Sequence, residues 1–393
     1  MGKYNFDEII PRKGTGCIKY DAPDRCPDNM QLWIADMDFK TPDFVLDALR
    51  ARLDHPVLGY PSTPASYTET ISGWLMQLHG IDVPAELIRF IPGIVRGFAF
   101  ALDALCKPGD QVIIQPPVYH PFKIVPEAKG YEVVFNPLTP IYDAEGHLTR
   151  YKMDLEHLES IISPRTKALI LSNPHNPCGI AWTREELAAL AQLTSRHGII
   201  VLSDEIHCEM LLGGRKHIPY ALSCPEAAQN SITFMAPSKT FNIAGIVSSY
   251  CFCLSEELRD KFYAYLEASE IDYPPIFSVI ACQAAYQHGT EWRAQMLEYV
   301  QGNVDFVDSW LKANLPEVHC VRPEASFLIW LDCRALGLNQ KDLVSLFEDK
   351  ACLSLNDGAM FGPGGEGFMR LNIGCPRSML QEALERLSHA VNG

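Results

Sequence analysis

Short runs of aliphatic and β-branched residues, each followed at once by polar residues, set the pattern of this chain. Four of them stand out, at residues 111–115, 168–172, 199–203 and 232–236. Continuous apolar runs of this length are typical of strands buried on both faces of a largely parallel sheet. Between the second and third runs, residues 183–197 carry an apolar helical face, and Thr183 and Glu186 form a capping-box pattern at its start. Strand, helix and strand in this order predict a right-handed crossover.

The last third of the chain predicts a smaller α/β domain. Its pattern indicates a helix over 292–315, a strand over 327–331, a helix near 341–350, a glycine-rich segment at 362–365 and a closing helix from Arg377. A chain of 393 residues is long enough for two or three domains. We therefore expect an N-terminal arm (1–44) that joins the small domain, a large ligand-binding domain (45–275) and a small C-terminal domain (276–393).

Residues with useful chemistry follow each of the four apolar runs. Tyr119 follows the first, Asn176 the second, Asp204 the third and Lys239 the fourth. In open α/β sheets, ligands bind outside the carboxyl ends of the strands. We therefore expect a ring, an amide, a carboxylate and an amine to share one crevice.

The charge of the chain limits its partners. The formal net charge is −15, and its lysines and arginines form no run, which argues against nucleic acid as a partner. The same charge repels anions at long range, so an anionic ligand needs a local binding site.

The cysteines and the apolar segments favour a cytoplasmic protein. The thirteen cysteines show no regular spacing, no Cys-x-x-Cys pair and no Cys/His cluster of the kind that holds a metal. The first ten residues lack the apolar core of a signal peptide, and no apolar run approaches the ~20 residues that span a bilayer. We expect free thiols in a reducing compartment, no metal and no membrane contact.

The side chains of the predicted crevice match the demands of pyridoxal 5′-phosphate. This cofactor needs an amine for a Schiff base, a carboxylate at its ring nitrogen, donors for its phenolate and phosphate, and an aromatic ring against its face. Lys239, Asp204, Asn176 and Tyr119 are the respective candidates for the amine, the carboxylate, the phenolate donor and the ring. Each also has an ordinary alternative: a solvated lysine, an N-capping aspartate, a loop asparagine and a half-buried loop aromatic.

A candidate for the phosphate site lies earlier in the chain. Residues 91–97, with glycines at 93 and 97, lead into an apolar helix that we expect to start near Phe98. Backbone N–H groups at a helix N-terminus bind phosphate well, although glycines before helices are common. No Gly-x-Gly-x-x-Gly follows a strand, which argues against a dinucleotide site.

Three ordered motifs resemble a known group of enzymes. Residues 173–179 (NPHNPCG), 203–207 (SDEIH) and 238–245 (SKTFNIAG) resemble the fold-type I pyridoxal-phosphate enzymes of the aminotransferase class I/II superfamily. Residues 33–39 (WIADMDF), 204–207 and 370–377 (RLNIGCPR) are similar to cystathionine β-lyases of the MalY/PatB type. The resemblance runs from about Phe6 to the end of the chain. It implies a large domain with a mostly parallel sheet and a smaller α/β domain.

The resemblance implies a set of cofactor contacts. Lys239 would carry the Schiff base and, once substrate displaces it, move the Cα proton. The other implied contacts are Asp204 at the pyridine nitrogen, Asn176 at the phenolate, Tyr119 on the ring, and Val95, Arg96 and Ser238 around the phosphate.

The resemblance also implies substrate and subunit contacts. Arg370 would grip the substrate carboxylate, for which the guanidinium fork is well shaped, although a surface ion pair is the usual role of an arginine. Ala35 and Asp36 would lie beside the substrate. Tyr60 would reach the neighbouring active site of a homodimer.

The sequence departs from the superfamily pattern at three positions. Ala236 replaces a frequent serine and Val247 replaces a frequent phosphate-binding arginine, so Ser238, the turn amides and Tyr60 are left to hold the phosphate. His207 stands where many aminotransferases have a tyrosine that contacts the phenolate. A packed histidine on the following helix explains it equally well.

The pocket residues serve more than one reaction. The similarity to the MalY/PatB type favours a carbon–sulfur β-lyase that converts L-cystathionine or a related cysteine S-conjugate to a thiol, pyruvate and ammonia. In that reaction Tyr119 would also assist proton transfer. The alternatives are an aromatic or broad-specificity aminotransferase and, in another class, a regulatory binding protein that keeps the cofactor without using it.

Overall fold

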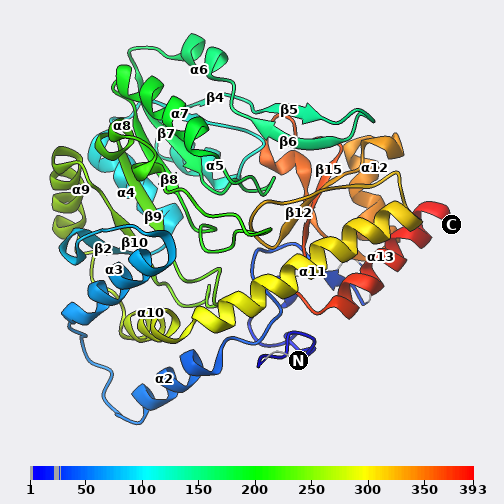
Figure 1. Ribbon diagram of the computed structural model, residues 1–393, viewed down its shortest axis with the longest axis horizontal. Helices are drawn as coiled ribbons and strands as arrows, with labels where there is room; N and C mark the ends of the chain where they lie inside the picture. Colours follow the sequence, from blue (N-terminus) through cyan, green and yellow to red (C-terminus); the bar gives the residue numbers. More distant parts are fainter. Residues whose placement is uncertain (1–2, 22–25, 27) are drawn as a thin grey trace.

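The structure, a computed structural model, describes residues 3–21, 26 and 28–393. Its centre is a seven-stranded sheet with the order β2-β10-β9-β8-β7-β3-β4, on the left of Figure 1. The strands are β2 Ile88–Ile91, β3 Gln111–Ile114, β4 Glu132–Phe135, β7 Thr166–Ser172, β8 Ile200–Asp204, β9 Ser231–Met235 and β10 Ser249–Phe252. Of these seven strands, β10 runs in the direction opposite to the other six. The predicted α/β class with a mostly parallel sheet is confirmed.

The four strands predicted from the apolar runs are β3, β7, β8 and β9, which lie side by side. Because they are parallel, their carboxyl ends meet at one edge of the sheet. The predicted helix between β7 and β8 is α7 (Arg184–Arg196), and Thr183 and Glu186 form its capping box. Strands β2, β4 and β10 were not predicted from the sequence; they are short, with four residues each, and include Arg89, Glu132 and Ser249 respectively.

Helices cover both faces of the large sheet. On one face lie α4 (Ile94–Leu105), α5 (Pro121–Ala128) and α9 (Glu256–Ala268); on the other lie α6 (Leu155–Ile161), α7 and α8 (Pro225–Gln229). Side chains alternate between these faces: Ile170 of β7 packs in the α4 layer, while Leu169 and Leu171 pack in the α7 layer. A third core joins α3 (Ala65–His79) and α10 (Ile276–His288) to β10 and to the small domain.

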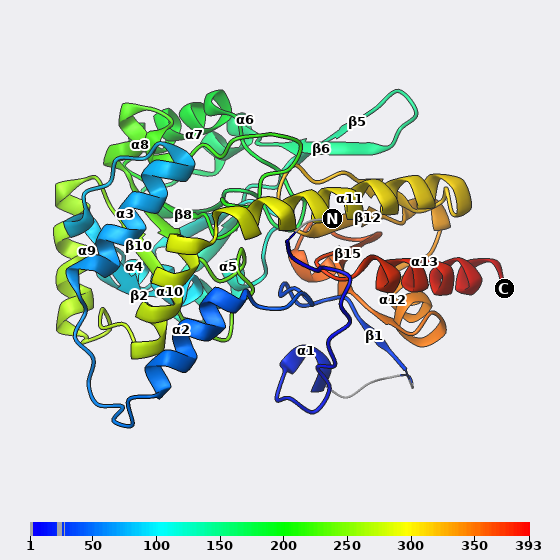
Figure 2. The same ribbon diagram turned by 60° about the horizontal axis from the view of Figure 1, so that its bottom comes forward.

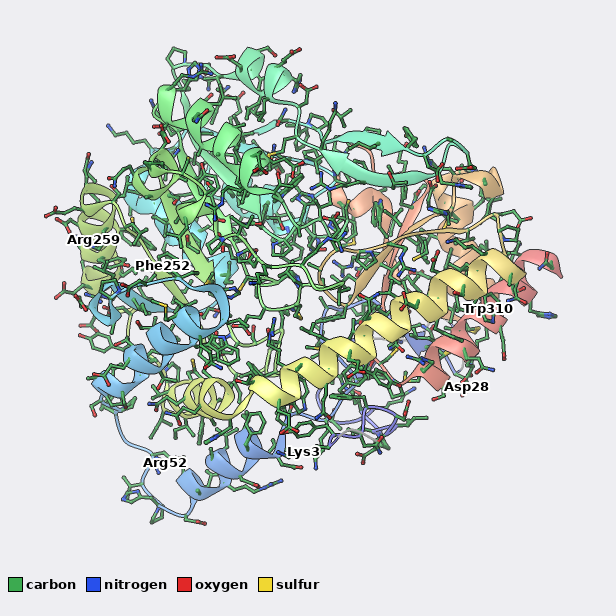
Figure 3. The ribbon with its side chains drawn as sticks, in the orientation of Figure 1. Lys3, Asp28, Arg52, Phe252, Arg259 and Trp310 are labelled. Atoms are coloured by element: carbon green, nitrogen blue, oxygen red, sulfur yellow. A yellow bond between two sulfur atoms is a disulfide. The ribbon has the colours of Figure 1, made fainter. Side chains whose placement is uncertain are left out.

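The small domain has its own four-stranded antiparallel sheet, on the right of Figure 1. Its strands, in the order they take in the sheet, are β11 His319–Val321, β12 Leu328–Asp332, β15 Phe368–Asn372 and β14 Asn356–Asp357. The predicted helices are present as α11 (Thr290–Asn314), α12 (Gln340–Ser345), which continues into the π-turn η4 (Leu346–Lys350), and α13 (Arg377–Asn392). Figure 3 labels Trp310 where α11 has reached the small domain.

The N-terminal arm lies against the small domain. After α1 (Ile18–Asp21), strand β1 (Met30–Gln31) pairs in parallel with β13 (Leu353–Ser354). This pairing supports the division into an arm, a large domain and a small domain, whose boundaries at 44/45 and 275/276 we keep as a proposal.

The expectation that all thiols are free is wrong for one pair. Cys26 and Cys352 form a disulfide, with their Cα atoms 5.7 Å apart, and the other eleven cysteines are free. The two positions are separated by 326 residues. No spacing pattern could indicate the pair, because only the docking of the arm on the small domain brings them together.

Short elements complete the described chain. A hairpin of β5 (Thr139–Tyr142) and β6 (Leu148–Lys152) projects beyond the sheet in Figure 2. The 3₁₀ turns are η1 Ala85–Leu87, η2 Tyr220–Leu222, η3 Arg334–Leu336 and η5 Gly358–Phe361. After α2 (Asp43–Leu53), near the labelled Arg52 in Figure 3, an exposed loop that contains Tyr60 leads to α3. No described helix combines the length and the apolar character that a bilayer crossing needs.

Candidate active site

A cavity of about 380 Å³ lies at the carboxyl ends of β3, β7, β8 and β9. This is a usual size and place for a small-molecule site in an α/β fold. The predicted residues that line it are Ala35, Val95, Tyr119, Asn176, Asp204, His207, Lys239 and Arg370. The strand-end residues expected to share a crevice therefore do so.

Lys239 follows β9 and turns its amine toward the N-terminal arm. Its Nζ donates a hydrogen bond to the backbone oxygen of Ala35, at 2.5 Å. Burial lowers the pKa of this amine to about 8, and the positive charge of Arg370 acts in the same direction, while Asp36 and Asp204 oppose the shift. The amine is thus much closer to neutrality at physiological pH than an ordinary lysine.

Asp204 is the last residue of β8 and is only 7% exposed. Its Oδ1 accepts a hydrogen bond from the backbone N–H of Ile206, at 3.1 Å. Burial raises its pKa to about 7, against the effect of that bond and of the Lys239 charge. Among the described residues it forms no ion pair, so a cation in the cavity would favour its charged form.

Arg370 comes from β15 of the small domain and is 4% exposed. Its Nη1 donates to Oδ1 of Asn176 at 2.9 Å, and its Nη2 donates to the backbone oxygen of Trp33 at 2.9 Å and to Oδ1 of Asn356. Its Nε is buried and has no hydrogen-bond partner in the part of the chain described. Burial lowers the pKa of this guanidinium to about 10. A buried cation with neutral neighbours and a free N–H is prepared for an anionic ligand.

Tyr119 and Asn176 face each other across the ends of β3 and β7. The backbone N–H of Tyr119 donates to the backbone oxygen of Asn176 at 3.1 Å, and the Asn176 N–H donates to Oγ of Ser172. Burial, helped by the charge of Asp204, raises the pKa of the Tyr119 phenol. Tyr119 therefore keeps its proton at physiological pH.

The start of α4 presents unpaired backbone donors to the cavity. No side chain caps this helix, which begins at Ile94 rather than near Phe98, and the N–H of Gly97 makes its first intrahelical bond, to Gly93. The N–H groups of Ile94, Val95 and Arg96 have no backbone partner among the described residues and can bind an anion. The guanidinium of Arg96 is exposed and donates to the Pro92 oxygen, so only the backbone of this residue fits the predicted contact.

Tyr60 and Ser238, also predicted as cofactor contacts, lie outside the cavity of the single chain. Tyr60 is fully exposed on the loop after α2. Ser238 is buried next to Lys239 but does not line the cavity. Val247, at the position of the frequent arginine, accepts a hydrogen bond from the Ser278 hydroxyl at its backbone oxygen. His207 does line the cavity, and it lies in a turn after β8 rather than on the expected helix. Its Nδ1 is buried without a described partner, and burial lowers its pKa to about 3, so the ring is neutral.

Asp36 is engaged by the arm rather than free for substrate. We define the arm cluster as Arg12, Lys19, Asp36 and Asp38. Arg12 pairs with Asp36 at 2.8 Å and with Asp38 at 2.6 Å, and the fully buried Lys19 pairs with Asp38 at 2.8 Å and with Asp36 at 3.4 Å. Burial alone would raise the pKa of Asp36, but the hydrogen bond from Arg12 and the charge of Lys19 lower it. Of the two arm residues predicted beside the substrate, Ala35 borders the cavity and Asp36 does not.

Several functional contacts escaped the sequence reasoning. Asn356 and the Trp33 oxygen orient Arg370. Asn242 and Asn372 hold the arm segment in place: Asn242 bonds to Met37 and Phe39, and Asn372 bonds to the backbone oxygens of Ile34 and Asp36. Asn242 and Asn372 lie within the motifs quoted above, so the motifs contained a signal for them. Asn356 carried none.

Comparison with known proteins gives one consistent family. A family model described as aminotransferase class I and II matches residues 27–387. The cystathionine beta-lyase PatB of Bacillus subtilis (strain 168) is 40% identical over 99% of this chain and 100% of its own length.

Two solved structures are similar over nearly their whole length. A pyridoxal-phosphate-bound protein of Clostridium difficile 630, provisionally assigned as an aminotransferase, superposes with a TM-score of 0.94 at 38% identity and covers 99% of this chain and 100% of its own. The pyridoxal-phosphate-bound C-S lyase of Staphylococcus hominis gives a TM-score of 0.91 at 31% identity, over 99% of this chain and 98% of its own.

Proposed function

The chain belongs to the aminotransferase class I and II family, and from this premise we propose that it is a pyridoxal 5′-phosphate-dependent carbon–sulfur β-lyase acting on L-cystathionine or related cysteine S-conjugates. The full-length similarity to a protein named as a cystathionine beta-lyase, and to a C-S lyase, supports this reaction. The observation that carries the proposal is the cavity lined by both Lys239, with its amine, and Arg370, whose buried Nε has no hydrogen-bond partner among the described residues.

The cavity fits pyridoxal 5′-phosphate. Lys239 would hold the cofactor covalently, and Asp204 would pair with its ring nitrogen, because a buried carboxylate without a partner is stabilised by a cation. Asn176 and Tyr119 would contact the ring, and the free N–H groups at the start of α4 would hold the phosphate. With valine at 247 and the Arg96 side chain turned away, backbone groups carry most of the phosphate binding within one subunit.

When bound, the cofactor withdraws electrons from the Cα of an amino acid joined to it, which makes the Cα proton removable. Lys239 is the base for that proton, since its lowered pKa of about 8 leaves part of the amine neutral at physiological pH. The Ala35 oxygen holds Nζ in a defined place by its hydrogen bond. Arg370 binds the substrate carboxylate and so fixes the direction of the Cα–H bond.

The overall reaction consumes one water molecule and, unlike that of an aminotransferase, needs no keto acid to accept the amino group. The Cβ–S bond breaks, its electron pair leaves on sulfur, and protonation gives the free thiol. The three-carbon fragment that remains takes up water and leaves as pyruvate and ammonia. Tyr119, which keeps its proton, would serve as the donor to the departing sulfur.

The proposal includes a homodimer. Tyr60 stands fully exposed on a loop whose apolar residues Val57 and Leu58 are also exposed. Exposed apolar side chains grouped on one projecting loop are typical of a surface that a partner covers. Tyr60 would then contribute to the phosphate site of the neighbouring subunit.

We also propose a cytoplasmic location, which the eleven free cysteines support. The disulfide between Cys26 and Cys352 counts against it. A titration of the free thiols in protein purified without reductant would show whether Cys26 and Cys352 are reduced or joined. A cytoplasmic protein should show this pair reduced.

The direct test of the reaction uses L-cystathionine alone. Purified holoenzyme should release pyruvate and a free thiol in equal amounts without any keto acid, and the Lys239→Ala variant should release neither. Turnover that requires a keto acid would replace the lyase by an aminotransferase. Bound cofactor without turnover of any amino acid would favour the regulatory alternative.

A further inference from the structure

A second cavity, of about 280 Å³, adjoins the catalytic cavity. Tyr119, His120 and Met360 line both, so the two spaces are neighbours across these three side chains. Phe361, which lines only the second cavity, lies under the Arg370 guanidinium, with 5.0 Å between the ring centre and Cζ. A substrate held by Arg370 would therefore have this second cavity beside it.

The walls of the second cavity are mainly apolar. They come from the end of β3, from α5, from β4 and from the glycine-rich loop after η5, and include Ile114, Ile124, Phe135 and Phe361. The glycine-rich loop packs closely on the segment after β3, since a Cβ on Gly362 would lie 3.2 Å from Cβ of Pro116. This close approach, together with a φ of +92°, explains the glycine at position 362.

The polar groups of the second cavity are few and uneven in charge. No carboxylate lines it, and Asp204 is the one carboxylate among the described residues that line the catalytic cavity. Lys123 is the one lysine or arginine among the described residues that line it. No ion pair to a described residue engages Lys123, and its Nζ lies 5.8 Å from the centre of the Phe135 ring. The Nδ1 of His120 is buried without a described hydrogen-bond partner.

We propose that this second cavity binds the sulfur substituent of the cysteine conjugate, and that it selects apolar or aromatic substituents, preferably with an anionic end, over the amino-acid end of cystathionine. The proposal rests on the lyase function given above. Apolar walls favour alkyl and aryl groups by excluding water. Lys123 attracts a terminal carboxylate, while the distal ammonium of cystathionine finds no carboxylate partner there.

Four substrates test the selectivity of the wild-type holoenzyme: S-methyl-L-cysteine, S-benzyl-L-cysteine, S-(4-carboxybenzyl)-L-cysteine and L-cystathionine. Pyruvate release should give a kcat/KM about tenfold higher for the benzyl conjugate than for the methyl conjugate or for cystathionine, because a filled apolar pocket discriminates by this order. The carboxybenzyl conjugate should be at least as good as the benzyl one. A kcat/KM for cystathionine above that for S-benzyl-L-cysteine would overturn the proposal.

Two variants on α5 locate the selectivity. Ile124→Trp should fill the cavity and lower kcat/KM for the benzyl conjugate about tenfold, with little change for the methyl conjugate. Lys123→Glu should lower kcat/KM for the carboxybenzyl conjugate about fivefold and raise it for S-(2-aminoethyl)-L-cysteine by a similar factor. Lys107→Glu is the matched control, because Lys107 is exposed before β3, at the opposite end of that strand.

The outcomes separate this proposal from the function on which it rests. If no conjugate yields pyruvate, the lyase function is wrong. A second outcome is that all conjugates yield pyruvate, but the ratios of kcat/KM between conjugates are the same in Ile124→Trp and Lys123→Glu as in the control Lys107→Glu. In that case the lyase function stands and the proposed subsite is wrong. Thermal unfolding of the holoenzyme confirms that each variant is folded before its kinetics are compared.

Discussion

Two groups of buried charge lie next to the arm segment 33–38, and they differ in how their charges are paired. In the arm cluster, Arg12 and Lys19 each contact both Asp36 and Asp38, at distances between 2.6 and 3.4 Å. In the catalytic cavity, Lys239, Arg370 and Asp204 form no ion pair with any described residue.

The pKa values follow the pairing. Asp36 is partly buried, yet its pKa is lowered because Arg12 and Lys19 favour its charge. Burial without a partner raises the pKa of Asp204 to about 7 and lowers that of Lys239 to about 8. Paired charges keep the arm in place, whereas unpaired charges cost stability that a bound ligand can recover. The comparison therefore distinguishes the charges of the arm cluster, which stabilise the fold, from the charges of the catalytic cavity, which are available to a ligand.

The largest expected effect is on catalysis. Arg370→Met should lower kcat/KM for a cysteine conjugate about a thousandfold, because the substrate carboxylate loses a buried charged partner. The free energy of unfolding should fall by no more than about 2 kcal/mol, because the loss of the hydrogen bonds to Asn176, Trp33 and Asn356 is offset by the removal of a buried cation without a counterion. Pyruvate assays and denaturant unfolding of the same preparation measure both effects. A much larger loss of unfolding free energy in Arg370→Met would show that Arg370 stabilises the fold in the same way as the arm cluster.

Lys19, a buried cation of the arm cluster, should contribute to stability rather than to substrate binding. Lys19→Met should lower the free energy of unfolding by about 3 kcal/mol, because it leaves two buried carboxylates to Arg12 alone. Denaturant unfolding of the holoenzyme is the measurement. The surface variant Lys261→Met, which breaks an exposed pair with Glu257, serves as the control and should change stability by less than about 1 kcal/mol. Equal effects of the two variants would contradict the structural role of the arm cluster.

A smaller and pH-dependent effect is expected at Asp204. Its folded-state pKa of about 7 lies above the unfolded value near 4, so the cofactor-free protein should lose stability as pH rises through that interval. Asp204→Asn removes this loss: at pH 8 the cofactor-free variant should be about 2 kcal/mol more stable than the wild type, with a smaller difference at pH 5. The same variant should bind pyridoxal 5′-phosphate more weakly. A stability difference independent of pH would show that burial does not perturb this carboxyl group.

Much of the fold and of the site was predictable because it depends on residues that are close together in the sequence. The apolar runs of β3, β7, β8 and β9 and the capping box of α7 are patterns of neighbouring residues. Parallel strands then bring Tyr119, Asn176, Asp204 and Lys239 to one edge by geometry alone. The position of Arg370 came from the family resemblance, since nothing near it in the sequence points to the cavity.

Contacts between distant segments were not predictable. The bond between Arg370 and Asn356 depends on how β14 pairs with β15, and the arm cluster depends on the path of the first forty residues. The disulfide between Cys26 and Cys352 and the second cavity likewise arise only when the arm, the small domain and α5 are assembled. None of these contacts leaves a periodic signal in the chain.

The central claim, that Lys239 carries the cofactor, is tested most directly by borohydride reduction of the holoenzyme followed by peptide mass spectrometry. The wild type should retain a reduced pyridoxyl phosphate group on the peptide that contains Lys239 and on no other lysine. Lys239→Ala should retain none, while the unfolding free energy of the cofactor-free variant stays close to that of the cofactor-free wild type, since burial disfavours the lysine charge. A reduced adduct on another lysine, or one that survives in Lys239→Ala, would contradict the account.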